Sequence, residues 1–355
     1  MDMMSRVQQA LDQQLALAHS PSAPPRLIAA MRHAVFPGGA RIRPQLCLAV
    51  ARACGEDAPA LTDAAAVAIE LLHCASLVHD DMPCFDDADT RRGQPTVHKL
   101  FGEPLALLAG DGLIVMAYQA LAQAGWRQPH RLAMLLRTIS DGTGAPDGIV
   151  AGQAWECETQ ADLGQYQRAK TGALFVASTC AGAQAAGADG ADWRGLGECL
   201  GEAYQVADDI RDVVFSADEL GKPAGQDIAH ERPSAARDLG LDGAMDHFRE
   251  LMRNAIASVP DCPARSAMRA LVLQESSRLI PPATNERIER LVRERRDYFW
   301  SFSDGEGWRH NYNEKFLLQS EQPVSNKAGS TAKLSFPVEW GPYRVEVIER
   351  NDQTF

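Results

Sequence analysis

Apolar residues recur with a helical period near 3.6 along most of the chain, from about residue 5 to residue 297. The period is interrupted only by short stretches rich in Gly, Pro and Asp, such as PSAPP, FPGGA, DGTGAPDG and VPDCPA, which are typical of turns between helices. The span shows neither the alternation typical of strands nor a repeat of fixed length. A chain of 355 residues is long enough to bury a large core. The sequence therefore predicts an all-α domain over residues 1–297.

Residues 298–355 differ from the rest of the chain in composition. They hold three of the six Trp, three of the six Tyr and five of the eleven Phe, and no Cys. The stretch LSFPVEWGPYRVEVIE alternates in part and is rich in β-branched and aromatic residues, which predicts one or two strands. We interpret residues 298–355 as a separate, short, irregular or β tail, accreted to the helical domain.

Charge and composition narrow the functional classes. A net charge of -12 with 45% hydrophobic residues is typical of a soluble acidic globular protein and argues against nucleic acid as a partner. The N-terminus lacks the apolar segment of a secretory signal, and no apolar run approaches the length of a membrane span. The eight cysteines show no zinc-site or CxxC spacing, so we expect buried, reduced thiols. These features predict a cytoplasmic protein without a membrane span.

An acidic group follows one of the predicted helices. The stretch LVHDDMPCFDDADTRRG, residues 77–93, contains five aspartates and then two arginines. Like charges at this density repel one another unless cations lie among them. His73, Leu77 and Asp80 fall at i, i+4 and i+7, so they share one helix face. We therefore expect the carboxylates at the mouth of a helix whose lower face is small and apolar.

A second acidic group, EAYQVADDIRD, places Gln205, Asp208, Asp209 and Asp212 at i, i+3, i+4 and i+7, on one stripe of a helix. For either group alone, a solvated acidic helix face is an equally good interpretation. Two groups on otherwise apolar helices favour a shared site. Carboxylates in twos and threes suit Mg²⁺, which binds one or two of them per ion together with phosphate oxygens. The sequence thus indicates a site in which several ions hold a diphosphate.

Seven ordered motifs resemble those of the trans-isoprenyl diphosphate synthase family. They are PGGARIRP, HCASLVHDD, DDMPCFDD with TRRG, GIVAGQAWECE, QRAKTG, YQVADDIRD, and LGKPAGQD with ERPS, and the resemblance covers roughly residues 25–290. A single aspartate pair is a weak signal, but an ordered series of motifs is specific. The resemblance implies the isoprenoid synthase fold, a bundle of antiparallel helices around a central cavity, usually as a homodimer.

The resemblance also implies roles for individual residues. The ligands of three Mg²⁺ ions would be Asp80, Asp81, Asp86, Asp208 and Asp212. The residues around the allylic diphosphate would be Arg91, Lys170, Thr171, Gln205, Asp209 and Lys222. Isopentenyl diphosphate, the second substrate, would be held by Arg43, His73 and Arg92. In this assignment the aspartates face metal ions and the arginines face phosphates.

The implied reaction follows from charge. Departure of diphosphate from the allylic substrate leaves a carbocation, the ions neutralise the leaving group, and an apolar cavity keeps water away. The double bond of isopentenyl diphosphate then attacks, and a proton is lost, with the departed diphosphate as the expected acceptor. No side-chain nucleophile is needed.

The sequence departs from the family pattern at several positions. Ala40 stands where the family has a lysine that contacts isopentenyl diphosphate, so we expect either weaker affinity or a compensating cation such as Arg41. Gln226 and Arg232 replace two further lysines, and Glu156 replaces an aspartate. None of these changes removes a predicted metal ligand.

Product length is predicted from the helix turn below Asp80. Ala75 and Ser76, five and four residues before that aspartate, are both small, whereas relatives that stop at fifteen carbons commonly carry an aromatic floor there. Together with the insertion Pro83-Cys84, this resembles bacterial and plant geranylgeranyl diphosphate synthases, which make a twenty-carbon product. Residues near Leu113 and Met116 offer an alternative floor for a longer product.

Other interpretations remain open at this point. They are a synthase of another chain length, a class I terpene cyclase, and a non-catalytic regulatory subunit. Arg43, Arg91 and Arg92 argue against a cyclase, which binds no second diphosphate, and the retained aspartates argue against a regulatory subunit. The tail resembles a fragment of a bacterial α2-macroglobulin-like protein, which suggests a non-enzymatic inhibitor as a further alternative.

Overall fold

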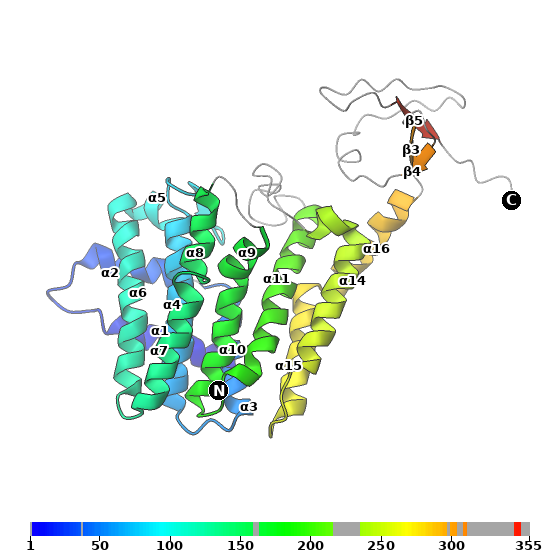
Figure 1. Cartoon of the computed structure of the whole chain (residues 1–355). Helices are drawn as coiled ribbons and strands as arrows, with labels where there is room; N and C mark the ends of the chain where they lie inside the picture. The colour runs from blue at the N-terminus through cyan, green and yellow to red at the C-terminus, as the bar shows by residue number, and fades with distance from the viewer. Residues whose placement is uncertain are drawn as a thin grey trace.

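Two long apolar helices, α4 (Pro59–Asp80) and α6 (Glu103–Gly125), pack side by side in the larger part of a helical bundle (Figure 1). Each has a proline in its first turn, where the missing N–H leaves no intrahelical bond unmade. They approach closely at Gly110, because a Cβ there would overlap the ring of His79. The computed structural model describes residues 2–36, 38–158, 163–215, 235–296, 299–303, 308–310 and 344–348.

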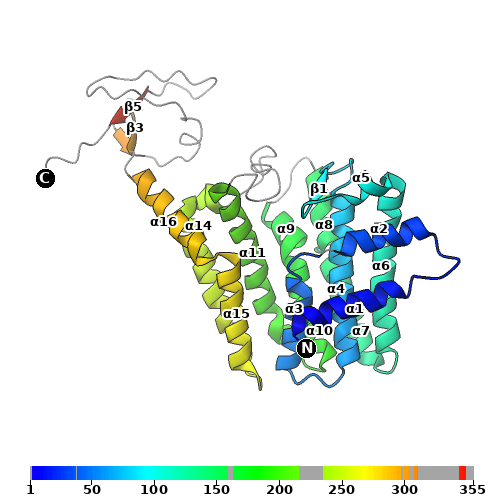
Figure 2. The same ribbon diagram turned by 180° about the vertical axis from the view of Figure 1, so that it is seen from behind.

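The remaining helices confirm the predicted all-α fold. They are α1 (Met3–Ala16), α2 (Pro25–Val35), α3 (Ile42–Ala53), α5 (Val97–Phe101), α7 (Pro129–Thr143), α8 (Ile149–Ala154), η1 (Trp155–Cys157), α9 (Leu163–Gln167), η2 (Arg168–Gly172), α10 (Ala173–Ala185), η3 (Ala191–Trp193), α11 (Arg194–Val214), α14 (Ala235–Ala257), α15 (Arg265–Leu279) and α16 (Pro282–Arg296). Figure 2 shows α1 and α2 lying crosswise over the helices behind them.

Two hydrophobic clusters share helix α10. Leu174 packs with the first cluster, around α1, α4, α6 and α7, and its neighbour Phe175 packs with the second, around α11, α14 and α15. A helix that buries opposite faces must be apolar all round, and ten of the thirteen residues of α10 are buried. Helix α10 therefore joins the two halves of the bundle, and α4 and α11 end at the same end of it (Figure 1).

Among its described residues, the C-terminal part contains three short strands after α16. They are β3 (Phe299–Ser303), β4 (Trp308–His310) and β5 (Arg344–Ile348), paired antiparallel in the order β4-β3-β5. β5 falls inside the stretch for which one or two strands were predicted. The predicted division of the chain at residue 297 stays a prediction.

Two expectations from the sequence need correction. Helices α4 and α6 are long and apolar enough, by length and composition, to cross a membrane, although no such run was expected. Of the 18-residue apolar segment within α4, 78% is buried inside the protein, as in the core helix of a globular protein. All eight cysteines are free, as expected, but Cys84 and Cys157 are exposed rather than buried.

Where the helical domain ends can be tested by two truncations. Ending the chain after residue 296 should leave the melting temperature and helical circular dichroism nearly unchanged, because the second cluster stays complete. Ending it after residue 264 removes the buried side chains Val272, Leu279 and Ile288, each worth about 1.5–3 kcal/mol, and should lower the melting temperature strongly. Equal loss of stability in both truncated chains would place the boundary elsewhere.

Candidate active site

The first acidic motif lies in a tight turn at the carboxyl end of α4. Asp80 and Asp81 are buried, with 8% and 3% exposure, because they complete a helix packed on all sides. The backbone N–H of Asp86 donates to the carbonyl of Asp80 at 3.0 Å, so the turn containing Pro83 and Cys84 folds Asp86 back over the helix end. The structure thus brings the predicted ligands of this motif together.

Arginine 91 neutralises one of these carboxylates. Its Nε donates to both oxygens of Asp81 at 2.8 and 2.9 Å, and its Nη2 lies 2.6 Å from Oδ1. Burial nevertheless raises the pKa of Asp81, and the neighbouring Asp80 and Asp86 add to this effect. In the structure, therefore, Arg91 faces a carboxylate of the predicted metal site.

Arg91 and Arg92 are carried by a hairpin that the sequence analysis missed. Strands β1 (Thr90–Arg91) and β2 (Gln94–Pro95) pair antiparallel, joined by Arg92 and Gly93, which have φ of 54° and 73°. Two residues with positive φ make the turn that matches strand twist, and glycine at the second position is its usual signal. The sequence Arg-Gly could have indicated it. The turn places Arg92 at the tip.

Lys170 joins the first motif to the next segment. Its Nζ lies 2.5 Å from Glu156 Oε1 and 3.3 Å from Asp80 Oδ1. The hydroxyl of Tyr166 also donates to Glu156, at 2.6 Å. Carboxylate oxygens of Asp80, Asp86 and Glu156 lie within 4.8 Å of one another. Three hard oxygen donors at this spacing fit Mg²⁺.

Glu156 was therefore missed as a member of the acidic cluster. The sequence analysis noted it only as a replacement for an aspartate in GIVAGQAWECE. The signal was its position in a motif, but the sequence does not show that the longer side chain of glutamate reaches across from η1 to the end of α4.

A π-helical turn, η2 (Arg168–Gly172), carries Lys170 and Thr171. Such wide turns occur mostly as single insertions in α-helices and often at functional sites. η2 is pressed between two helices at glycines: a Cβ on Gly152 of α8 would overlap the backbone of Lys170, and one on Gly201 of α11 would lie 2.8 Å from the Cα of Gly172. Small residues on both sides thus bring the elements of the site together.

The second acidic motif lies on α11. The hydroxyl of Thr171 donates to Gln205 Oε1 at 3.1 Å, and Gln205 Nε2 donates to Asp209 Oδ1 at 2.9 Å. Asp209 is 2% exposed, and its Oδ2 accepts from the backbone N–H of Ala235 at 2.7 Å. Asp209 therefore holds Gln205 and the start of α14. Asp208 and Asp212 are half-buried on the same helix.

Of the three residues predicted to bind isopentenyl diphosphate, Arg43 and Arg92 act electrostatically on the third, His73. The guanidinium of Arg43 lies 4.5 Å from the ring centroid of Phe175 and 5.8 Å from that of Tyr204. Burial lowers the pKa of His73 well below its ordinary value, and the charges of Arg43 and Arg92 lower it further. His73 is consequently neutral at pH 7.

Arg41 is not available as the compensating cation considered for Ala40. Its side chain is fully buried and pairs with Glu70, whose side chain is 3% exposed. It also donates to the carbonyl of Val35. The hypothesis that Arg41 contacts the substrate is therefore wrong, because its side chain is removed from solvent and both of its Nη atoms donate to partners inside the protein.

The predicted product-length residues differ in environment. Ala75 is 1% exposed and packs in the first cluster, whereas Ser76 is half-buried and its hydroxyl donates to the carbonyl of His73 at 2.8 Å. Leu113 and Met116 of α6 belong to the same cluster as Ala75. Lys222, Gln226 and Arg232 lie outside the described residues.

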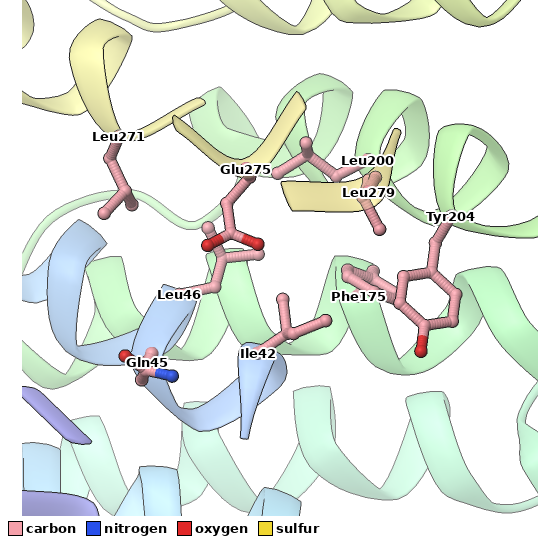
Figure 3. A pocket seen from close by; sticks show the side chains of 9 residues that line it. All are labelled: Ile42, Gln45, Leu46, Phe175, Leu200, Tyr204, Leu271, Glu275 and Leu279. Carbon is pink, nitrogen blue, oxygen red and sulfur yellow. The ribbon is translucent and has the colours of Figure 1, made fainter. Parts of the chain in front are cut away.

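Two pockets flank this region. One is lined mostly by apolar side chains of α3, α10, α11 and α15, with Phe175 and Tyr204 side by side at one edge and the Glu275 carboxylate among them (Figure 3). None of the predicted site residues lines it. The other pocket is lined in part by Asp81, Arg91 and Arg92, so it opens onto the predicted site.

Comparison with known proteins assigns the helical part of the chain. Residues 24–270 match the polyprenyl synthetase family, and residues 268–355 match bacterial macroglobulin domain 6. The second match begins inside α15, although α15 packs with the bundle.

Relatives and solved structures agree with this assignment. Geranylgeranyl diphosphate synthases of Cereibacter sphaeroides and Rhodobacter capsulatus are 51% and 49% identical, over 80% and 81% of this chain and 98% and 100% of theirs. A geranyltransferase of Helicobacter pylori, solved with magnesium and isoprenyl diphosphate, is 29% identical with a TM-score of 0.65 over 78% of this chain and 97% of its own. The chain therefore belongs to the polyprenyl synthetase family.

Proposed function

We propose that the chain is a Mg²⁺-dependent prenyltransferase that condenses isopentenyl diphosphate with allylic diphosphates and makes mainly geranylgeranyl diphosphate. The observation that carries this proposal is the group of three carboxylates, Asp80, Asp86 and Glu156, beside Lys170. A group of this kind is costly to keep unless cations bind it. Relatives named geranylgeranyl diphosphate synthase support the choice of reaction and product.

The metal ligands are proposed on the two helix ends. Asp80, Asp86 and Glu156 would hold ions on one side, with Asp81 next to them, and Asp208 and Asp212 on the other; three ions are proposed in all. Bound Mg²⁺ would neutralise charge on the departing diphosphate. The protein keeps the ligands close by pairing Asp81 with Arg91 and Asp80 with Lys170.

Basic and polar side chains complete the two substrate sites in this proposal. Arg91, Lys170 and Thr171 would bind the allylic diphosphate, with Gln205 oriented by Asp209, and Lys222 would join them. Arg43 and Arg92 would bind isopentenyl diphosphate by charge. His73, neutral because of its lowered pKa, would donate one N–H bond to it.

A homodimer through α6 is proposed for the assembly. Three apolar side chains on this helix are exposed: Leu107 by 47%, Leu108 by 50% and Val115 by 56%. Of the 18-residue apolar segment of α6, only 44% is buried. Exposed apolar faces of this kind mark interaction surfaces. With a net charge of -12 and eight free cysteines, we propose a cytoplasmic enzyme without a membrane span or nucleic-acid partner.

Product length is tested by supplying labelled isopentenyl diphosphate with geranyl or farnesyl diphosphate in Mg²⁺ and separating the products by length. The twenty-carbon product should dominate, and Ala75→Tyr should shift output towards fifteen carbons because an aromatic ring would block the path below Asp80. Ser76→Phe tests the same path by placing an aromatic ring at the half-buried neighbouring residue. Unchanged product length in both folded variants would show that the chain grows along another face. Consumption of geranylgeranyl diphosphate without isopentenyl diphosphate would indicate a cyclase instead.

Metal binding is tested by thermal unfolding. Saturating Mg²⁺ with inorganic diphosphate should raise the melting temperature by roughly 5–10 °C at about 100 times Kd. Asp80→Asn should remove most of the increase and lower turnover by about 10² or more, because a metal ligand acts on the transition state. Asp246→Asn on α14, away from the site, is the control. The same increase in Asp80→Asn as in the parent would rule out the proposed ligand.

The dimer is tested by light scattering. Leu108→Glu with Val115→Glu should convert a dimeric parent into a monomer, since two charges would be buried in an apolar interface. Leu17→Glu, at a leucine directly after α1 that is 64% exposed, should stay dimeric. A monomeric parent, or a double variant that stays dimeric, would contradict the proposed interface.

A further inference from the structure

A buried ion pair lies next to the proposed isopentenyl diphosphate site. It joins Arg41, the residue before α3, to Glu70 in the middle of α4, and their side chains are 0% and 3% exposed. Arg41 has a left-handed backbone with φ of 50°. Removing two charges from water is costly, and an apolar pair of similar volume is often equally stable. Stability alone therefore does not account for this pair.

The position of Arg41 shows what the pair holds. Its guanidinium lies directly against Gly38, where a Cβ would overlap it, and it donates to the carbonyl of Val35 at the end of α2. Arg41 thus fills the space under the turn of residues 38–40 between α2 and α3. It supports this turn from inside the protein.

The same turn packs against Arg92, which is proposed to bind isopentenyl diphosphate. A Cβ on Gly39 would lie 3.0 Å from three atoms of the Arg92 guanidinium, so Arg92 packs against bare backbone. On the other side, Glu70 precedes His73 by three residues on α4, and the two lie on neighbouring parts of one helix face. The ion pair therefore joins the turn that packs against Arg92 to the helix that carries His73.

Glu70 also acts through charge. Burial lowers the pKa of Arg43, and the charge of Arg92 lowers it further, because the two guanidinium groups repel each other. Glu70 opposes this effect on Arg43 while it neutralises Arg41. With alanine at position 40, few cations remain for the second diphosphate, and their placement matters more.

We propose that Arg41 and Glu70 are positioning residues, which hold the turn of residues 38–40 and, through it, Arg92 in place for isopentenyl diphosphate without touching that substrate. This inference rests on the proposed function. A misplaced ligand lowers affinity for one substrate only, whereas a purely structural pair would affect stability alone.

The test is Arg41→Met with Glu70→Leu, which removes both charges and keeps most of the volume. We expect the KM for isopentenyl diphosphate to rise about tenfold or more, with the KM for farnesyl diphosphate within about twofold. Arg131→Met with Asp57→Leu removes another ion pair, 2.6 Å long, which lies just before the start of α4, at the opposite end of that helix from Asp80, and should change neither KM. An unchanged KM for isopentenyl diphosphate in the folded double variant would overturn the inference.

A second variant covers the case in which the double variant does not fold. Gly38→Ala displaces the Arg41 guanidinium while both charges remain, and the backbone of Gly38 is not left-handed. It should raise the KM for isopentenyl diphosphate selectively, and an unchanged value would again overturn the inference. A parent that makes no prenyl product contradicts the proposed function itself, whereas an active parent with unaffected variants contradicts the inference alone.

Discussion

The contact of Lys170 with Asp80 and Glu156 joins three elements, of which α4 is distant in sequence from the other two. α4 brings Asp80, η1 brings Glu156 and η2 brings Lys170, at 3.3 and 2.5 Å. Without this cation the carboxylates at the end of α4 would repel one another. The glycines that let η2 approach α8 and α11 serve the same contact, because a side chain at either would hold the lysine away. The packing of the bundle and the charge of the site are therefore linked.

The arginines of the region fall into two groups. Arg41 pairs inside the protein with Glu70 and is removed from solvent. Arg43 stacks on aromatic rings and Arg92 lies at the tip of a hairpin, so both keep donors for a ligand. Arg91 stands between the groups, since it neutralises Asp81 while 35% of its side chain stays exposed. Arginines that are neighbours in the sequence, Arg41 and Arg43 or Arg91 and Arg92, thus have different environments.

Most of the fold was predictable from the sequence because helical periodicity is a local property. The i, i+4 and i+7 spacing placed His73 and Asp80 on one helix face, and both belong to the buried helix α4, whose last residue is Asp80. Other features depend on contacts between distant segments. The burial of Arg41, the entry of Glu156 into the acidic cluster and the exposed face of α6 each depend on what lies opposite, which periodicity does not report. The Arg92-Gly93 hairpin was a local signal that was missed.

The central claim is that the carboxylates of α4 and α11 hold divalent ions around a diphosphate. The most direct measurement is anomalous diffraction from crystals of the full chain grown with Mn²⁺ and an unreactive thio analogue of farnesyl diphosphate. The account predicts Mn²⁺ peaks at about 2.1 Å from oxygens of Asp80 and Asp86 and from Asp208, with the diphosphate between them. Peaks elsewhere, or none while the analogue is bound, would contradict it.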